Sequence, residues 1–202
     1  MPITDPETKA DCAMTSRPTP IIDCACDDVR WEKLQDVLVC HAIFILDWLG
    51  LPPAQLSLKL VDDAAMAALN ARYRNKQGAT NVLAFPAYDF AAPLAHDFAA
   101  PLVRDFPAPL VRDFPPVETD GVLLGDVVLA YDRLADEAQS GGISLKNHAV
   151  HLLTHGVLHL LGYTHDEARA AALMEKLESD LLLAQGLPDP YGDSVSIKEK
   201  TA

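Results

Sequence analysis

The sequence lacks a long apolar run. Half of its 202 residues are hydrophobic, but the longest apolar segments, such as 42–46 and 181–184, end far short of the ~20 residues that cross a bilayer. Residues 1–21 contain Pro, Thr and Asp, and they lack the basic start and apolar core of a secretion signal. We therefore expect a globular protein that is cytoplasmic and does not contact a membrane.

Positive charge is also scarce. The chain has 16 Lys and Arg against 29 Asp and Glu, a net charge of −13. Proteins that grip nucleic acid over a wide surface usually present a basic face, so we expect no DNA partner, and any RNA contact must be local. The one concentrated basic segment holds Arg72, Arg74 and Lys76.

Cysteine is sparse and confined to the first fifth of the chain. Cys24 and Cys26 are separated by one residue, not the two that are usual in zinc knuckles and redox motifs, and no second pair sits at ligand spacing. We expect free thiols in a reducing compartment.

The order of the expected elements favours a single α+β domain with one mixed sheet covered by helices. Residues 1–27 are expected to be a disordered leader, 28–192 the domain, and 193–202 a C-terminal tail. Apolar periodicity and end signals predict helices and strands in the following order: helix 28–49, strand 55–61, helix 64–72, strands 81–85 and 122–130, and helices 131–139, 145–161 and 166–184.

An eight-residue repeat interrupts the domain at 89–116. Its units begin at Asp89, Asp97, Asp105 and Asp113, and each contains proline, which disfavours helix and weakens a strand ladder. We interpret this insertion as an expanded, largely disordered hairpin loop between two strands. The alternative is a partner-docking arm that uses the repeated Phe and Leu.

A histidine cluster follows in the helix predicted over 145–161. His155 and His159 are four residues apart, so both imidazoles leave one helix face. Gly162 can reverse the chain and return His165 as a third ligand. Three imidazoles suit zinc and leave a coordination position open, which is typical of catalytic sites. The sequence therefore predicts one zinc ion per chain at the end of a central helix.

Two neighbouring positions refine this prediction. His151 lies four residues before His155, and we interpret it as an imidazole behind the ligands or facing substrate, although a ligand role is open. A zincin protease places Glu directly after its first ligand histidine, as the general base. Here that residue is Gly156, so peptide hydrolysis by that mechanism is disfavoured.

Three motifs in order resemble the YbeY family over residues 31–192. They are Leu69-Asn-Ala-Arg-Tyr-Arg74, Thr80-Asn-Val-Leu-Ala-Phe-Pro86, and the segment His155-Gly-Val-Leu-His159-Leu-Leu-Gly-Tyr-Thr-His165, with Leu124-Gly-Asp126 also in the family's order. The resemblance implies a zinc-dependent, single-strand-specific endoribonuclease of ribosomal RNA maturation (processing of the 16S 3′ end) and ribosome quality control. Implied partners are ribosomal RNA and the small subunit with its proteins.

The resemblance also implies residue roles. His155, His159 and His165 become the metal ligands, with His155 also counted as catalytic. Arg74 takes the place of the family's functional arginine, as a catalytic and substrate-binding residue that can clamp a phosphate. Thr80 and Asn81 fall on the strand that the family uses along its cleft.

Two residues depart from the family pattern. Thr164 stands where the family usually has Asp, which removes one carboxylate that could stand behind the ligands, and Asp166 or Glu167 is a candidate to replace it. Ala84 replaces a usual Ser. Two other functions stay open: a zinc hydrolase of another phosphoester or amide, and a non-catalytic, zinc-stabilised ribosome assembly module, which the acidic net charge suits.

Overall fold

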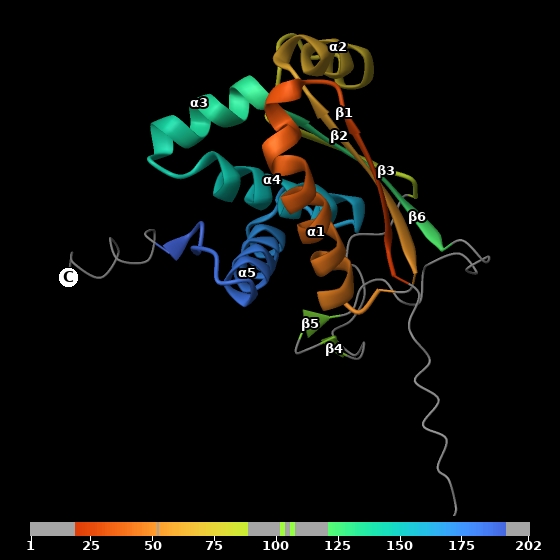
Figure 1. Ribbon diagram of the computed structural model, residues 1–202. Coiled ribbons are helices and arrows are strands. Elements are labelled where there is room, and N and C mark those ends of the chain that lie inside the picture. Colours follow the sequence, from red (N-terminus) through yellow and green to blue (C-terminus); the bar gives the residue numbers. More distant parts are fainter. Residues whose placement is uncertain (1–18, 52, 89–101, 104–105, 108–120, 193–202) are drawn as a thin grey trace, which may run out of the picture.

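The computed structural model describes residues 19–51, 53–88, 102–103, 106–107 and 121–192. The fold is α+β, as predicted, with helices packed against one mixed sheet (Figure 1). After the short 3-10 helix Val29–Trp31, the helices are α1 (Glu32–Trp48), α2 (Asp63–Arg74), α3 (Tyr131–Gly141), α4 (Leu145–Leu160) and α5 (Ala168–Ala184). The strands are β1 (Ile21–Cys26), β2 (Ala54–Val61), β3 (Val82–Pro86), β4 (Leu102–Val103), β5 (Phe106–Pro107) and β6 (Val122–Ala130).

The main sheet has the strand order β1-β2-β6-β3. β1 runs parallel to β2 and β2 parallel to β6, whereas β3 pairs antiparallel with β6. β3 is therefore an edge strand, and α4 lies against it and β6. This placement puts the histidine-bearing helix beside an edge of the sheet.

The assignment of residues 21–26 to a disordered leader is wrong. They form β1, which pairs with β2 from Ile21↔Gln55 to Cys26↔Leu60. Alternate side chains of this strand, Ile22 and Cys24 among them, pack against the core. The sequence pattern did not reveal this strand, because its inward-facing side chains include the half-buried Cys24 and Cys26, and a free cysteine packs as a small hydrophobe. Residues 1–18 of the predicted leader lie outside the described residues.

Most of the octapeptide insertion also lies outside the described residues. Within it, β4 and β5 pair antiparallel, with Leu102 opposite Pro107 and Val103 opposite Phe106. The strands that flank the insertion, β3 and β6, pair antiparallel, as the predicted hairpin connection requires.

Local sequence signals account for the helices that cover the sheet. α1 buries Leu38, Ala42, Ile45 and Leu46, which recur at helical spacing on one face. Asp62 caps the start of α2, because its carboxylate accepts from the backbone N–H of Ala65 at 2.8 Å. Among the described residues, no helix has both the length and the apolar composition needed to cross a bilayer.

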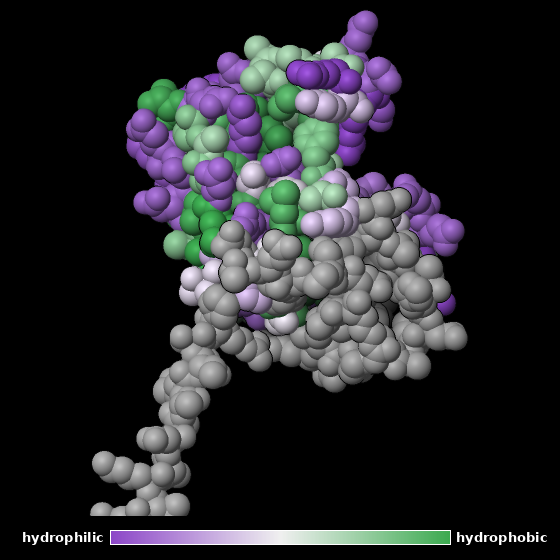
Figure 2. All heavy atoms as spheres, turned by 90° about the vertical axis from the view of Figure 1, so that its right-hand side faces the viewer, coloured by the Kyte–Doolittle hydropathy of each residue, from purple (hydrophilic) through white to green (hydrophobic). Residues whose placement is uncertain are grey.

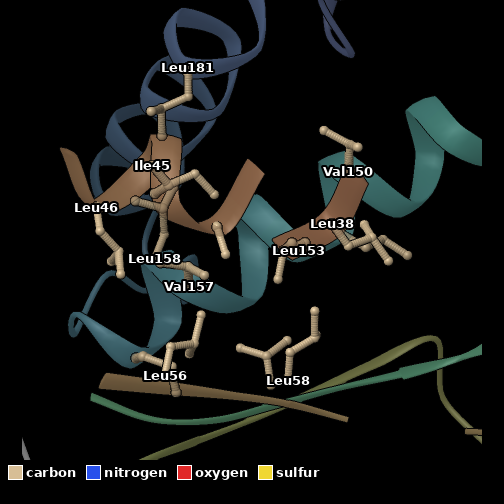
Figure 3. Packing of buried hydrophobic residues seen from close by; sticks show 14 of the residues in the cluster. Leu38, Ile45, Leu46, Leu56, Leu58, Val150, Leu153, Val157, Leu158 and Leu181 are labelled. Atoms are coloured by element: carbon tan, nitrogen blue, oxygen red, sulfur yellow. The ribbon is translucent and has the colours of Figure 1, made fainter. Parts of the chain in front are cut away.

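The core lies between the sheet and the layer formed by α1, α4 and α5. Figure 3 shows Leu56 and Leu58 of β2 pointing up toward Val157 and Leu158 of α4, with α1 and α5 beyond. Burying this many Leu and Val side chains, at ~1.5–3 kcal/mol each, fixes α4 on the sheet. The helix that carries the predicted ligands is thus among the most firmly held elements.

α2 packs on the opposite face of the sheet. A second apolar cluster there joins Met66 of α2 to Leu83 of β3 and Val128 of β6. Figure 2 views the molecule from the sheet side, where hydrophilic and hydrophobic residues are intermixed around α2. A hollow of about 430 Å³ on this face is lined by Lys59, Tyr73 and Asp126, among others.

Candidate metal centre

Three histidines converge at the C-terminal end of α4. His155 and His159 project from the helix, and Gly162, with φ of 83°, takes the left-handed conformation that reverses the chain. His165 returns from the following loop, and one nitrogen from each imidazole lies within 4.8 Å of the other two. The predicted gathering of these three side chains is confirmed.

Hydrogen bonds at the far side of two rings determine their tautomers. His155 Nδ1 lies 2.8 Å from Glu178 Oε1, and His159 Nδ1 lies 2.9 Å from the backbone oxygen of Tyr163. Both oxygens are acceptors, so each Nδ1 carries the proton and donates. In the neutral rings the lone pair is consequently on Nε2.

The two Nε2 atoms face each other at 3.0 Å. Two lone pairs at this separation repel unless a cation lies between them. Two imidazole nitrogens bound tetrahedrally to one ion at ~2.0–2.1 Å would be roughly 3.3 Å apart. The arrangement of His155 and His159 therefore fits a bound metal ion.

The imidazole of His165 supplies the third nitrogen donor of the cluster. The ring centroid of His165 lies 5.5 Å from that of His155 and 5.1 Å from that of His159, and His165 is exposed. The exposed ring of His165 leaves one side of the cluster open to solvent. Three nitrogen donors with an open side are the chemistry of a site that could hold zinc and still admit a small molecule.

Electrostatics keep His159 neutral in the metal-free protein. Burial, followed by the nearby His155, lowers the pKa of His159 to about 4. An imidazole must be neutral to bind a metal. At neutral pH the ring of His159 is therefore in the protonation state that a metal ion requires.

A buried carboxylate stands behind the ligands. Glu178 of α5 is 1% exposed and accepts hydrogen bonds from His155 Nδ1, from His151 Nε2 at 2.8 Å and from the hydroxyl of Tyr191. Burial alone would raise the pKa of Glu178, but the three hydrogen bonds outweigh burial and lower the pKa to about 2. His151 is held by this carboxylate and is not in the three-histidine group.

The sequence did not identify Glu178 as the carboxylate behind the histidines. Asp166 or Glu167 was expected to replace the family's usual Asp at Thr164, yet within the described residues neither of them hydrogen-bonds to the three rings. A signal was present in α5, because Glu178 falls in the apolar stripe formed by Met174, Leu177, Leu181 and Leu182. A carboxylate at a core position requires partners.

The structure also explains why residue 156 has no side chain. A Cβ at Gly156 would lie 2.8 Å from Val127 Cγ1 and 3.3 Å from Val82 Cγ2. The position that carries the general base in zincins therefore faces the sheet here, where a glutamate has no room.

Arg74 lies apart from the histidines along the chain and in its packing. It is the last residue of α2, which covers the opposite face of the sheet from α4, and it is exposed. Asn75 follows with φ of 54° and ends the helix in the left-handed region. In the described part of the chain, no hydrogen bond or ion pair joins Arg74 to the histidine cluster.

Thr80 and Asn81 immediately precede β3, and both are half-buried. The amide nitrogen of Asn81 donates to Glu137 Oε2 at 2.9 Å, and its amide oxygen accepts from the backbone N–H of Val82. Glu137 also accepts from His148 Nε2 at 2.9 Å. Asn81 thus ties the start of β3 to α3 and α4.

Fold and site together define an α+β protein whose central helix carries a three-histidine centre able to hold a metal ion. The family model described as "Endoribonuclease YbeY" matches residues 27–186. An endoribonuclease YbeY of Rhodospirillum rubrum is 43% identical over 142 residues, which cover 70% of this chain and 60% of that relative. That of Ruegeria pomeroyi is 40% identical over 178 residues, 84% of this chain and 97% of the relative.

The solution structure of TM1509 from Thermotoga maritima is also similar, at 15% identity and a TM-score of 0.49, over 90% of this chain and 97% of that one. The match to the Rhodospirillum rubrum relative spans less than two thirds of its length. The family match covers most of the described domain, and the relatives agree with it. The chain belongs to the endoribonuclease YbeY family.

Proposed function

We propose that this chain is a zinc-dependent endoribonuclease specific for single-stranded RNA. In this proposal it is a cytoplasmic protein that acts on ribosomal RNA at the small subunit, in processing of the 16S 3′ end and in ribosome quality control. The observation that carries the proposal is the convergence of three imidazole donors within 4.8 Å in a chain of the YbeY family.

His155, His159 and His165 would hold the zinc ion. When bound, zinc supplies Lewis-acid polarisation of a phosphodiester oxygen and a lowered pKa for a nearby water. The chain's own contribution is to orient the ligand rings, through Glu178 for His155 and the Tyr163 carbonyl for His159. The apolar packing of α4 on the sheet keeps that geometry rigid.

Arg74 is proposed as the residue that binds substrate phosphate. Its guanidinium is exposed at the end of α2, close in sequence to Arg72 and Lys76, in a chain that is otherwise acidic. A planar fork can hold two phosphate oxygens at once and offset charge that develops on them. Thr80 and Asn81 are proposed to line the RNA path, with Asn81 acting mainly by holding the start of β3.

The test measures zinc content and cleavage of a single-stranded RNA in parallel, with a duplex of the same sequence for comparison. The wild-type protein should hold about one zinc per chain and cleave the single strand only. His159→Ala should lose both properties. Arg74→Lys should keep zinc but cleave roughly 10-fold or more slowly, because lysine keeps the charge and loses the fork. Arg133→Ala, an exposed arginine of α3, serves as the control.

Each other outcome has a defined meaning. Zinc binding without metal-dependent cleavage would favour the assembly-module function, for which the net charge of −13 is well suited because a protein partner needs no basic face. Cleavage that survives in His159→Ala would show that the histidine centre is not the active site.

A further inference from the structure

We propose that Glu178 is a positioning residue for the metal centre, and that Tyr191, in the segment that follows α5, holds its carboxylate in place. The carboxylate would select the metal-binding tautomer of His155 and hold His151 beside it. This inference rests on the proposed function, because it assigns a role to a residue behind the same centre.

The first observation is that one carboxylate serves two histidines on one helix. Its Oε1 faces His155 Nδ1 and its Oε2 faces His151 Nε2, each at 2.8 Å. His151 and His155 are one turn apart on α4, and Glu178 reaches both from α5. Because an ionised carboxylate only accepts, it places a proton on His155 Nδ1 and leaves Nε2 free for an ion.

The second observation is that Glu178 is almost completely buried. Its exposed fraction is 1%, whereas His151 and His155 keep 20% and 23% of their side chains exposed. A charged group at this depth is costly unless it is fully hydrogen-bonded. Its three donors meet that cost, so the carboxylate has one arrangement available rather than several.

The third observation is the segment that closes the site. Tyr191 donates its hydroxyl to Glu178 Oε2 at 2.5 Å, and its ring meets the ring of His151 edge-on, with centroids 5.8 Å apart. Asp189 fixes this segment to α5 by accepting from the hydroxyl of Ser179 at 2.7 Å and from the N–H of Tyr191. The family match ends at residue 186, so Tyr191 is supplied by the segment that follows it.

The substitution Glu178→Gln tests the proposal because it keeps the shape of the side chain. An amide offers one acceptor instead of two, so it cannot accept from both His155 and His151. The zinc dissociation constant of the folded variant, measured by competition with a chromophoric chelator, should rise roughly 10- to 100-fold. In the metal-free wild type, ¹⁵N-edited NMR should show His155 protonated at Nδ1, and in Glu178→Gln a mixture of tautomers.

Asp180→Asn is the matched control, since it neutralises a carboxylate of the same helix that pairs with Lys176 at the surface. It should bind zinc as the wild type does. Tyr191→Phe should weaken zinc binding several-fold. This second variant still tests the proposal if Glu178→Gln does not fold. A folded Glu178→Gln with wild-type zinc affinity and an unchanged His155 tautomer would overturn the proposal, as would unchanged affinity in Tyr191→Phe where Glu178→Gln does not fold.

The two proposals fail in different ways. The tautomer is read without metal and without RNA, so it tests Glu178 even if the wild type cleaves nothing. Loss of RNA cleavage with unaltered zinc affinity and tautomer in Glu178→Gln would contradict the positioning role and leave the endoribonuclease proposal standing.

Discussion

The histidines on the two flanks of α4 have different hydrogen-bond partners. On the flank toward α1, His41 is 2% exposed, with Nε2 2.8 Å from the hydroxyl of Thr154 and Nδ1 2.5 Å from the side-chain oxygen of Gln185. On the flank toward α5, His155 contacts Glu178 through Nδ1 and directs Nε2 toward Nε2 of His159. Thr154 and His155 are adjacent in sequence, yet they belong to these two separate environments.

The difference lies in which nitrogen is left over. Both nitrogens of His41 are used by neutral partners, so no lone pair remains and the residue links α1, α4 and α5. The carboxylate of Glu178 uses only one nitrogen of His155, so the other can bind an ion. A buried histidine is therefore a ligand or a structural link according to its partners, which residue type alone does not reveal.

The largest expected effect is on zinc affinity, and it should appear when His155 is substituted but not when its neighbour Thr154 is. His155→Ala should raise the zinc dissociation constant roughly 100-fold or more, because it removes one of three ligands. Thr154→Val should leave zinc affinity within about two-fold but lower the free energy of unfolding by ~1–3 kcal/mol, because His41 loses a buried partner. Chelator competition and denaturant unfolding of metal-free protein measure the two quantities. Marked zinc loss in Thr154→Val would show that the flanks are coupled.

The next largest effect is a fall of about 2 kcal/mol in the free energy of unfolding of metal-free protein when the pH is lowered from 7 to 5.5. The folded-state pKa values of His41 and His159 are about 4, whereas an unfolded histidine titrates near 6.5. Below pH 6.5 protons bind the unfolded chain preferentially, so the free energy of unfolding of metal-free protein should fall from pH 7 to 5.5, by ~1 kcal/mol for each histidine.

Denaturant unfolding at the two pH values measures this fall, and His41→Gln should remove about half of it. A pH-independent free energy of unfolding would contradict the burial of these two rings as neutral groups.

The smallest effect concerns the third face of α4, which rests on the sheet. Gly156→Ala should lower the free energy of unfolding by ~1 kcal/mol, because the crowding against Val127 and Val82 exceeds the gain in helix propensity. Gly141→Ala in α3 is the control, since its Cβ would make only ordinary contacts with Ile143 at 3.7 Å or more. Denaturant unfolding compares the two. A Gly156→Ala protein as stable as Gly141→Ala would show that α4 can shift on the sheet.

Much of the fold was predictable because periodicity and end signals are local. The strand predicted over 55–61 is β2 at Ala54–Val61, and the helix predicted over 145–161 is α4 at Leu145–Leu160. β1 was not predicted, because six residues with two cysteines carry a weak signal until pairing with β2 gives them a face. Parallel pairing between segments separated by a helix is a tertiary property.

The residues of the candidate site likewise include some that local sequence predicts and others that depend on tertiary packing. The three histidines were predictable because two share a helix turn and the third follows a helix-ending glycine. The apolar stripe of α5 marks Glu178 as a buried carboxylate, but its partners, like the place of Tyr191, arise only when α5 packs on α4 and the chain after α5 folds back. The partners of Asn81 also come from another helix, so its structural role could not be inferred from its position before β3.

The close packing of α4 against the sheet limits which residue can stand at position 156. The spacing His155-x-x-x-His159 is shared with peptide-cleaving metal helices, in which a glutamate stands at the position that Gly156 occupies here. A glutamate there would have to push the helix off Val127 and Val82 before it could serve any reaction. A glutamate at this position therefore requires space that the packing of α4 on β6 and β3 does not leave.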